Sequence, residues 1–595
     1  MKLPYGLADY YDLITGGYLY VDRTSHIRFI EDFGRALVFI RPRRFGKSLW
    51  LRTLACYYDL RLAEEFDRLF GHLAAGREPT PLHNRYFVLE WDFSLVDPRG
   101  DAGDIGGKLW KHCNGRIKAF LRRYRDFLPA AVEVDRDPAI TLDSLLAVIE
   151  ETPYKLYLLI DEYDNFINEV MTKDAAAYRA LVYQDGPFKQ LFKAVKAAMA
   201  GRGLERVFLT GISPVALSDV SSGFNVARDV YLEPELATLC GFREAEIRDI
   251  LERIADERKL SYDTRAEALA TMRNWYNGYR FCEGEELVYN PTNALHFLDH
   301  LERRGAPPAE LHDRNLAMDQ GKMAFVSRNE AGARVITGLA QGDGTVDILS
   351  LEKSFSMEDL LRKLRVDERF IASFLYYLGL LTHDQGVRFR IPNLVVRKLY
   401  LDRMLELSLP AAEEVNQVRK TALDFYRSGE LAPLLELVEA KLLPVLSHRD
   451  ARSLGRMRGQ GASELALKSL LLSLLFDDQL YTPFSEIELA QRFADLCLLV
   501  RPHRRDDDFL DFLFELKHVP LKQAGQTGEQ LHRLDAEALC ELPAVAGALA
   551  EAHDQAAGYS RTLADRFGQG LRLHAYAVVM VGLQRLVGKE VVVLP

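Results

Sequence analysis

The sequence predicts an α/β protein of several domains, on three observations. The first 240 residues alternate short β-rich runs with longer helical patterns, which is typical of a parallel sheet covered by helices on both faces. The middle of the chain is mostly helical, and the last segment returns to strands around one long helix. At about 100–200 residues per domain, the length of 595 residues suggests three to five domains.

The composition is that of an ordinary globular protein, with 48% apolar and 27% charged residues. No run approaches the roughly 18 apolar residues that span a bilayer, and the N-terminus lacks the apolar core of a signal peptide. Six scattered cysteines without a CxxC pair fit a reducing cytoplasm. The net charge of −10 argues against non-specific coating of nucleic acid, but local basic grooves stay open. We expect a cytoplasmic protein with no membrane part.

The segment 1–242 contains the strands of the predicted parallel sheet. Each candidate is a short β-branched or aromatic run that a longer helical pattern follows. The four candidates are ALVFI (36–40), YFVLEWDF (86–93), LYLLI (156–160) and RVFLTGI (206–212).

A phosphate-binding loop is predicted where the first strand meets the next helix. Gly46, Lys47 and Ser48 stand at this junction, where backbone N–H groups and the helix dipole favour phosphate oxygens. Lys47 would reach the β- and γ-phosphates of a nucleotide, and the Ser48 hydroxyl would ligate Mg²⁺. The pattern GxxxxGK[ST] requires glycine at position 41, where this chain has Arg41. The motif is thus incomplete, and a Gly-Lys-Ser triplet can also occur by chance.

Two later strands carry residues that fit the same site. Asp161 and Glu162 follow the strand 156–160, at the edge where parallel sheets bind ligands. Asp161 would hold Mg²⁺ and Glu162 would polarise the attacking water, although such a pair can also be a solvated turn. Thr210 or Ser213, after the fourth strand, would sense the γ-phosphate or simply cap a turn. Together these elements predict ATP as the nucleotide.

The middle of the chain predicts three smaller parts. Residues 243–350 form a helical lid, with loops expected at NPTNALHF (290–297) and AQGDGTVD (340–347). Residues 351–408 read as helix, turn, helix and hairpin, the order of a winged helix, and 409–460 is a helical connector. The basic side chains Arg388, Arg390, Arg397, Lys398 and Arg403 would hold DNA or pack within the lid. The basic runs at 122–125 and 501–505 are further candidates or solvated faces.

The segment 461–595 predicts a small α/β domain with a group of carboxylates. Its elements are an apolar helix from 464, strands within 479–489, 492–500 and 511–519, a long helix at about 535–566 and a closing strand at 574–582. Glu515 and Lys517 share one face of their strand because side chains alternate. Asp495, on the preceding strand, could meet Glu515 and chelate Mg²⁺ or Mn²⁺. Lys517 would then orient water or neutralise charge on a phosphate.

Weaker candidates surround this group. Glu464, on the opening helix, could add a third carboxylate, but an exposed helical acid is the stronger interpretation. Glu486 and Glu488 are alternatives to it. Gln555 and Tyr559 stand one helical turn apart and could contact a nucleic-acid backbone, and a tyrosine at the core edge is the rival interpretation.

These residues resemble a family, the bacterial and archaeal AAA-ATPase-like proteins with a C-terminal PD-(D/E)xK nuclease domain. The resemblance covers most of the chain, and its most specific element is the arginine-rich loop 41–48, which in that family replaces the glycine-first loop. Further matching elements are 20–24, 160–164, 210–213, 222–225, 276–281 and 289–291. Arg23 replaces the usual lysine, Asn165-Phe166 stands where a proline is usual, and Arg492 stands where the nuclease motif has glycine.

The resemblance implies the fold and the activity. The fold is a P-loop ATPase core with helical lid and winged helix, followed by a small α/β restriction-endonuclease-like domain. Arg43, Arg44, Phe45 and Gly46 would join Lys47, Ser48 and Asp161 in nucleotide binding, and Asp495, Glu515 and Lys517 would form the nuclease site. Arg280 is a candidate sensor or finger arginine. The family also implies DNA as substrate and links to phage defence or mobile elements.

The leading hypothesis is therefore an ATP-controlled, metal-dependent nuclease that acts on DNA. The alternative is an ATP-driven signalling or assembly scaffold with an inactive, nucleic-acid-binding nuclease fold, and Arg492 favours it. A translocating helicase-like motor ranks last because no second motor lobe is evident. A homo-oligomer is compatible with each hypothesis.

Overall fold

The computed structural model divides the protein into two compact units. The first consists of Met1–Pro308 and Val346–Leu394, and the second of Ala309–Thr345 and Val395–Pro595. The predicted lid 243–350 and the predicted winged helix 351–408 each contribute residues to both units. The boundaries of the five predicted segments remain predictions. The structure describes residues 1–183, 185–220, 224–311, 317–353, 355–409, 411–444, 461–477, 479–484, 487–489, 492–501, 504–567 and 570–592.

The first unit contains a parallel sheet with the strand order β2-β3-β4-β1-β5. Four of its strands are those that the sequence predicts, and a short fifth strand extends the sheet beside β1. The strands are β1 (Ala36–Ile40), β2 (Tyr86–Asp92), β3 (Lys155–Asp161), β4 (Leu204–Gly211) and β5 (Arg228–Asp229). All five residues of β1 are buried, as expected of a strand that is covered on both faces.

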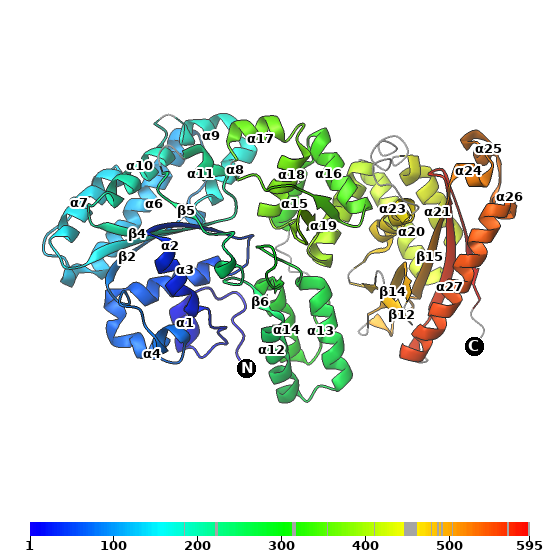
Figure 1. The fold of residues 1–595 in the computed structure, drawn as a ribbon, viewed down its shortest axis with the longest axis horizontal. Coiled ribbons are helices and arrows are strands. Elements are labelled where there is room, and N and C mark those ends of the chain that lie inside the picture. Colours follow the sequence, from blue (N-terminus) through cyan, green and yellow to red (C-terminus); the bar gives the residue numbers. More distant parts are fainter. Residues whose placement is uncertain are drawn as a thin grey trace. The chain divides into compact units, whose positions relative to one another are not determined.

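Helices cover both faces of this sheet (Figure 1). α3 (Lys47–Tyr58) lies on one face, and α6 (Ala102–Arg123), α7 (Pro138–Glu150) and α10 (Pro187–Met199) lie on the other. The buried residues of α6 recur every three or four positions, which gives one apolar stripe toward the sheet. The remaining helices of this core are α1 (Tyr10–Thr15), α2 (Ile27–Phe33), α4 (Phe66–Phe70), α5 (Ala74–Arg77), α8 (Asn165–Lys173), α9 (Ala175–Val182) and α11 (Val215–Val220).

Three helices follow the sheet in the first unit: α12 (Glu244–Arg258), α13 (Tyr262–Tyr276) and α14 (Pro291–Arg304), with the short paired strands β6 (Phe242–Arg243) and β7 (Val288–Tyr289). The prediction of a loop at 290–297 was wrong, because α14 begins at Pro291. Asn290 caps the helix by accepting a hydrogen bond from the Asn293 amide at 3.2 Å, and proline occupies the first turn. Both residues are helix-start signals rather than loop signals.

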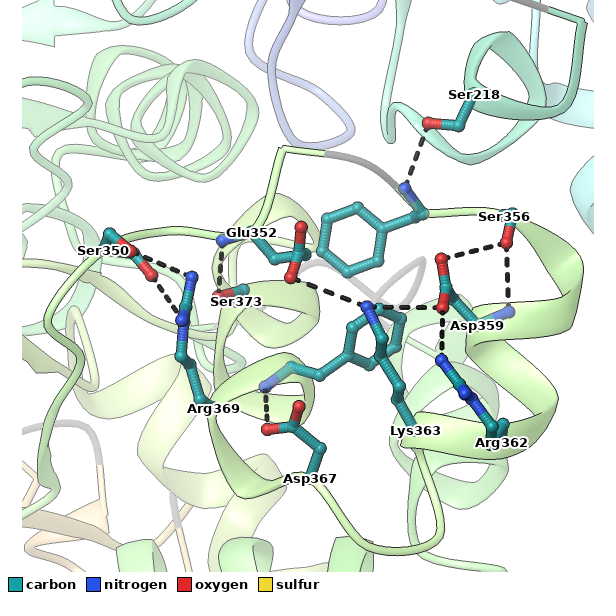
Figure 2. Close-up of polar contacts among 12 residues, drawn as sticks. Ser218, Ser350, Glu352, Ser356, Asp359, Arg362, Lys363, Asp367, Arg369 and Ser373 are labelled. Atoms are coloured by element: carbon teal, nitrogen blue, oxygen red, sulfur yellow. Dashed lines mark hydrogen bonds and ion pairs between the residues drawn. The ribbon is translucent and has the colours of Figure 1, made fainter.

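The segment predicted as a winged helix has the expected element order. It contains α17 (Met357–Lys363), α18 (Glu368–Tyr377), β9 (Thr382–His383) and β10 (Arg388–Arg390), and β8 (Thr345–Asp347) joins the two short strands in one sheet. Figure 2 shows how polar contacts hold it together: the Lys363 ammonium lies 3.3 Å from Asp359 and 3.8 Å from Glu352. The Phe355 amide also donates to the Ser218 hydroxyl of α11 at 3.0 Å, which ties this segment to the helix after β4.

His383 of β9 makes the stability of this segment depend on pH. Its ring packs against Phe389 at 4.3 Å and Tyr376 at 5.3 Å, and burial lowers the pKa of His383 to about 4 despite the opposing charge of Glu283. Because the unfolded side chain has a pKa near 6.5, stability is full above about pH 6.5 and is lost as the pH falls toward 4. After a discount for partial exposure we expect a loss of about 1–2 kcal/mol.

Calorimetric melting of wild type and His383→Gln at pH 7 and pH 5 tests this prediction. The melting temperature of the wild type should fall more between the two pH values than that of the variant. An equal fall in both proteins would assign the acid sensitivity to other groups.

The second unit combines helices with a mixed sheet of order β11-β14-β15-β16-β17. β15 (Asp511–Val519) pairs antiparallel with β14 (Leu496–Val500) and parallel with β16 (Leu573–Val581). The other strands are β11 (Tyr481–Phe484), β17 (Arg585–Val591) and the separate pair β12 (Ile487–Leu489) and β13 (Arg492–Ala494). The strand predicted at 574–582 is therefore not the closing strand, because β17 follows it.

Both faces of this sheet are buried. α27 (Pro543–Phe567) covers one face, where Leu513 and Val579 belong to the apolar core. On the other face Phe425 of α20 stacks on Phe512, with 4.4 Å between the ring centroids. The remaining helices are α15 (Ala317–Val326), α16 (Glu330–Gln341), α19 (Leu394–Ser408), α20 (Ala412–Ser428), α21 (Leu431–Leu437), α23 (Gly461–Leu475), α24 (Leu521–Ala524), α25 (Gly528–Arg533) and α26 (Ala536–Glu541). In the described ranges, no helix is both long and apolar enough to cross a membrane.

Candidate functional site

The predicted phosphate loop connects β1 to α3 in the first unit. Arg44 and Gly46 adopt left-handed backbone conformations, with φ of 66° and 92°, and these bend the chain back over the start of the helix. Lys47, the first residue of α3, is buried, and its ammonium donates to the Pro42 carbonyl at 3.0 Å. The first N–H groups of α3 have no partner within the helix, so the loop and helix form an anion-binding site of the kind that phosphates occupy.

Arg41, which stands where the glycine-first motif has glycine, points away from this loop interior into the protein. Its guanidinium donates to the carbonyls of Tyr231 at 2.6 Å and Leu236 at 2.9 Å. The same group lies over the rings of Phe39 and Phe281 at 4.5 and 4.1 Å. Burial lowers the pKa of Arg41 to about 10. Arg41 thus anchors the loop, and the missing glycine does not remove a phosphate contact.

The outer residues of the loop pack on the segment 276–281, which the resemblance singled out. Phe45 is buried edge-on against Tyr279 at 4.8 Å and Phe281 at 5.2 Å. Its side chain is therefore used for packing, and only its backbone is available to a phosphate. In contrast, the Arg43 side chain and the Ser48 hydroxyl have no hydrogen-bond partner among the described residues, so both are available to a nucleotide or its Mg²⁺.

The acidic pair after β3 lies at the same edge of the sheet. β4, which carries Thr210, is inserted between β1 and β3, and the Thr210 hydroxyl donates to Asp161. Asp161 also accepts from the Glu162 amide at 3.0 Å. Glu162 has a left-handed backbone with φ of 47°, and Asn165 donates to its carboxylate. Of the two predicted sensor residues, Thr210 is the one in contact with Asp161.

Ser213 has a different contact, with an acid that was not among the predicted site residues. Asp164 is fully buried and accepts from the Ser213 amide at 2.8 Å and from its hydroxyl at 3.1 Å. The Tyr163 hydroxyl donates to the Ser213 carbonyl at 2.5 Å. The loops after β3 and β4 are therefore locked together. The signal for Asp164 was its position three residues after Asp161 in a motif that the resemblance already contained.

The electrostatics of the loop favour a bound anion. Burial lowers the pKa of Lys47, and the carboxylates of Glu162, Asp161 and Asp164 oppose this shift and keep the ammonium charged. Triphosphate oxygens would replace the single carbonyl that Lys47 now contacts. For Mg²⁺, the donor set fits in kind: the Ser48 hydroxyl and the buried Asp161 carboxylate are hard oxygen ligands.

The other predicted basic residues have internal contacts. The Arg280 side chain donates to the carbonyls of Glu285 at 2.9 Å and of Asp384, which gives it a structural role in this state. Each of the five basic residues predicted for DNA contacts other parts of its own unit, which favours packing. Arg388 lies 3.3 Å from Asp347, Arg390 3.5 Å from Asp384 and Lys398 3.6 Å from Asp402; Arg397 donates to the Gly342 carbonyl at 3.1 Å and Arg403 to Ser327 at 2.7 Å.

The two basic runs are also partly used internally. In the run 122–125, Arg123 binds the Asp59 carboxylate at 2.5 Å. In the run 501–505, Arg504 pairs with Asp507 at 3.0 Å and Arg505 with Asp511 at 2.5 Å, while residues 502–503 lie outside the described residues.

In the second unit the predicted carboxylates converge around β15. Asp495 lies at the break between β13 and β14, and its carboxylate accepts from the Leu516 amide at 2.8 Å. Lys517 lies 3.5 Å from Glu515, and it donates to Gln555 of α27 at 2.8 Å. Glu464 of α23 accepts from the His518 amide at 3.2 Å. Asp495, Gln555 and Glu464, which come from three separate segments, thus all contact residues 516–518 of β15.

Burial gives this cluster unusual proton affinity. Burial, with the negative charge of Asp495, raises the pKa of Glu515 to about 7. The Glu515 Oε2 atom is buried and has no hydrogen-bond partner, so the site contains an oxygen that a cation or proton would satisfy. Burial opposes the charge on Lys517, but the surrounding carboxylates raise its pKa. Among the described residues, no group of three or more His, Cys, Asp or Glu side chains has the arrangement of a metal site.

Of the weaker candidates in this unit, some contact the carboxylate cluster and others do not. Gln555 contacts Lys517, as stated above, whereas Tyr559, also on α27, is buried in the apolar core. Glu488 lies in β12, and Glu486 lies outside the described residues. Glu551, which was not among the predicted residues, lies 3.5 Å from Lys517. Only its spacing of four residues from Gln555 on one helix could have indicated it.

A family match covers the part of the chain that contains the first of these two sites. Residues 4–221 match the family model described as "Predicted AAA-ATPase". This part of the chain is AAA-ATPase-like. It includes the loop, β3 and the loop after β4, so the match covers all the predicted nucleotide-binding residues.

A relative extends beyond the AAA-ATPase-like part. The chain is 24% identical over 545 residues to an uncharacterized protein in the vnfD 5′ region of Azotobacter chroococcum mcd 1, across 89% of this chain and 92% of that protein. Among solved structures, the Walker-type ATPase paby2304 of Pyrococcus abyssi matches 64% of this chain and 94% of its own at 14% identity and a TM-score of 0.37. The ORC2 protein of Aeropyrum pernix matches 65% and 93% at 13% identity and a TM-score of 0.29.

Proposed function

We propose that this protein is an ATP-controlled, divalent-metal-dependent nuclease that acts on DNA. The observation that carries the proposal is the cluster at β15, where Asp495, Glu515 and Lys517 meet and Glu515 Oε2 is buried without a partner. Glu515 is buried and Asp495 is half-buried, and carboxylates that lie close together in such a place are costly unless a cation compensates them. The AAA-ATPase-like part supplies the nucleotide-dependent control.

The chemistry assigned to each side chain follows from its surroundings. Asp495 and Glu515 would hold Mg²⁺ or Mn²⁺, a cation that polarises a phosphate and activates a bound water. The Lys517 ammonium, kept charged by nearby carboxylates, would neutralise the charge that develops on the phosphate. Glu464 fixes the backbone beside Lys517 through the His518 amide. In the first unit, Lys47, Ser48 and Asp161 would bind ATP and Mg²⁺, and Glu162 would orient water.

A second candidate is an ATP-driven scaffold whose nuclease fold is inactive. It is favoured by the contacts that already occupy the cluster: Asp495 accepts a backbone hydrogen bond and Lys517 donates to Gln555. The two candidates differ in whether a cation replaces these contacts. DNA rather than RNA, a homo-oligomer, a cytoplasmic location and a role in phage defence or mobile-element biology remain predictions of the sequence.

Cleavage assays with the full-length protein separate the two candidates. Linear, circular and single-stranded DNA and RNA are incubated with Mg²⁺, Mn²⁺ or EDTA, with and without ATP. We expect metal-dependent cleavage of DNA that Asp495→Asn and Glu515→Gln abolish and Lys47→Ala alters. Asp554→Asn, an exposed carboxylate on the same helix as Gln555, is the matched control and should cleave normally.

The remaining outcomes also decide the question. Cleavage that persists in Asp495→Asn and Glu515→Gln would rule out this cluster as the nuclease site. Absence of cleavage together with intact ATP turnover would leave the scaffold as the function.

A further inference from the structure

A cavity of about 490 Å³ lies beside β2, the edge strand of the first unit's sheet. Arg52 and Cys56 of α3, Glu90 of β2, and Arg116 and Phe120 of α6 are among the residues that line it. No residue of the phosphate loop 41–48 does. Small-molecule sites in proteins have volumes of roughly 300–1,000 Å³ and a few convergent polar groups. This α3–α6 cavity has both properties and is separate from the nucleotide loop.

The cavity is not an open place for another β-strand. The Val88 amide of β2 donates to the Tyr124 hydroxyl at 3.1 Å, and the Glu90 carbonyl accepts from Arg116 Nε at 2.9 Å. Side chains of α6 and the residue after it therefore already satisfy outward-facing backbone groups of the edge strand. A ligand here would be recognised by side chains.

The carboxylates around the cavity already have partners. Asp59 accepts from Arg123 at 2.5 Å and from the Tyr124 hydroxyl at 2.8 Å. Glu90 accepts from Arg52, and burial raises the pKa of Glu90 while the nearby arginines oppose this shift. Glu65 accepts from the Tyr11 hydroxyl at 2.8 Å, and Asp9 caps α1. Asp59 and Glu90 are therefore paired with arginines, and each of the four acids accepts at least one hydrogen bond from the protein.

Two arginines of the cavity, Arg52 and Arg116, in contrast, have N–H groups that are not used in hydrogen bonds among the described residues. Arg116 uses only Nε, and its two terminal nitrogens have no hydrogen-bond partner among the described residues. Arg52 uses only one terminal nitrogen, which binds Glu90. Arginine presents its donors as a planar fork that matches carboxylate and phosphate oxygens. Beside these donors, Ala55, Leu62 and Phe120 contribute apolar surface to the cavity lining.

We propose that the α3–α6 cavity binds a small organic anion. Its carboxylate or phosphate group would contact Arg52 and Arg116, and its apolar or aromatic body would lie against Leu62 and Phe120. The proposal does not depend on the nuclease or on ATP hydrolysis. Arg52 follows Lys47 by five residues on the same helix, about 7.5 Å along its axis, so a test must exclude binding of the probe at the phosphate loop.

Calorimetric titration of the full-length Lys47→Ala protein provides this test. The probes are phenyl phosphate, benzoate, AMP and inorganic phosphate. We expect at least one organic probe to bind, and Arg116→Gln to weaken its affinity by about tenfold or more through loss of charge-assisted hydrogen bonds. Arg122→Gln, an exposed arginine on the same helix, is the matched control and should bind like its parent.

A second variant guards against a general effect of Arg116→Gln on folding. Ala119→Phe fills the cavity from α6 and should block the same probe, while melting temperatures verify that all variants are folded. Preference for phenyl phosphate or for benzoate identifies the anionic group. Binding that is equal in Arg116→Gln and Arg122→Gln, or that survives Ala119→Phe, or no binding of any organic probe, would overturn the proposal.

Discussion

Replacing Lys47 with alanine is expected to reduce ATP hydrolysis by about 10²–10³-fold. The Lys47 ammonium is buried at the start of α3 and is held by a single loop carbonyl at 3.0 Å. It is therefore preorganised to contact phosphate oxygens, where a lost donor costs about 2.7–4 kcal/mol of transition-state stabilisation. Steady-state hydrolysis, together with binding of a non-hydrolysable ATP analogue, measures the effect.

The matched control for this experiment is Lys193→Ala. Lys193 is an exposed lysine of α10 on the opposite face of the sheet, and its removal should leave hydrolysis unchanged. Because Lys47 is buried, the melting temperature of each variant must be measured as well. Hydrolysis within a factor of three of wild type in a folded Lys47→Ala protein would mean that the loop 41–48 is not the catalytic phosphate site.

The nucleotide-binding part of the fold was largely predictable from the sequence because its signals are local. A buried strand such as 36–40 is a continuous apolar run, and the helix after Gly46 begins at a recognisable junction. The order of the strands was not predictable, because the insertion of β4 between β1 and β3 depends on long-range pairing. That insertion brings Thr210 to Asp161, and periodicity alone could not choose between Thr210 and Ser213.

In the second unit, the sequence located the carboxylates but not their surroundings. Alternation along β15 correctly grouped Glu515 with Lys517, which lie 3.5 Å apart. Alternation does not show what covers their own face, which packs against α27 in the structure. The sequence of a strand that is covered on both faces does not indicate which helices pack against it. The raised pKa of Glu515 therefore came only from the structure.

The role of Arg41 could not be predicted from the sequence motif. In the GxxxxGK[ST] pattern, Arg41 occupies the position where glycine is required, so the sequence motif is incomplete. In the structure its guanidinium donates to three backbone carbonyls, of Ile40, Tyr231 and Leu236. Only the resemblance removed the apparent defect, and it gave no physical reason. The reason is that a buried fork of donors can fix a loop that elsewhere relies on a small residue.

Restoring glycine at this position is therefore expected to damage the protein. Arg41→Gly should lower the free energy of unfolding of the first unit by roughly 3–5 kcal/mol, because it leaves buried carbonyls unpaired and creates a cavity between two rings. Arg41→Lys, which keeps the charge but not the fork, should fall between the variant and wild type. Thermal and denaturant unfolding measure these differences.

Arg43→Gly is the matched control, because it makes the same backbone change two residues away. The Arg43 side chain has no hydrogen-bond partner among the described residues, so its loss should cost only about 1 kcal/mol of stability while weakening binding of an ATP analogue. Arg41→Gly should show the opposite order, with stability affected first. If both variants lose the same stability, the buried guanidinium does not hold the loop, and position 41 tolerates glycine as ordinary phosphate loops do.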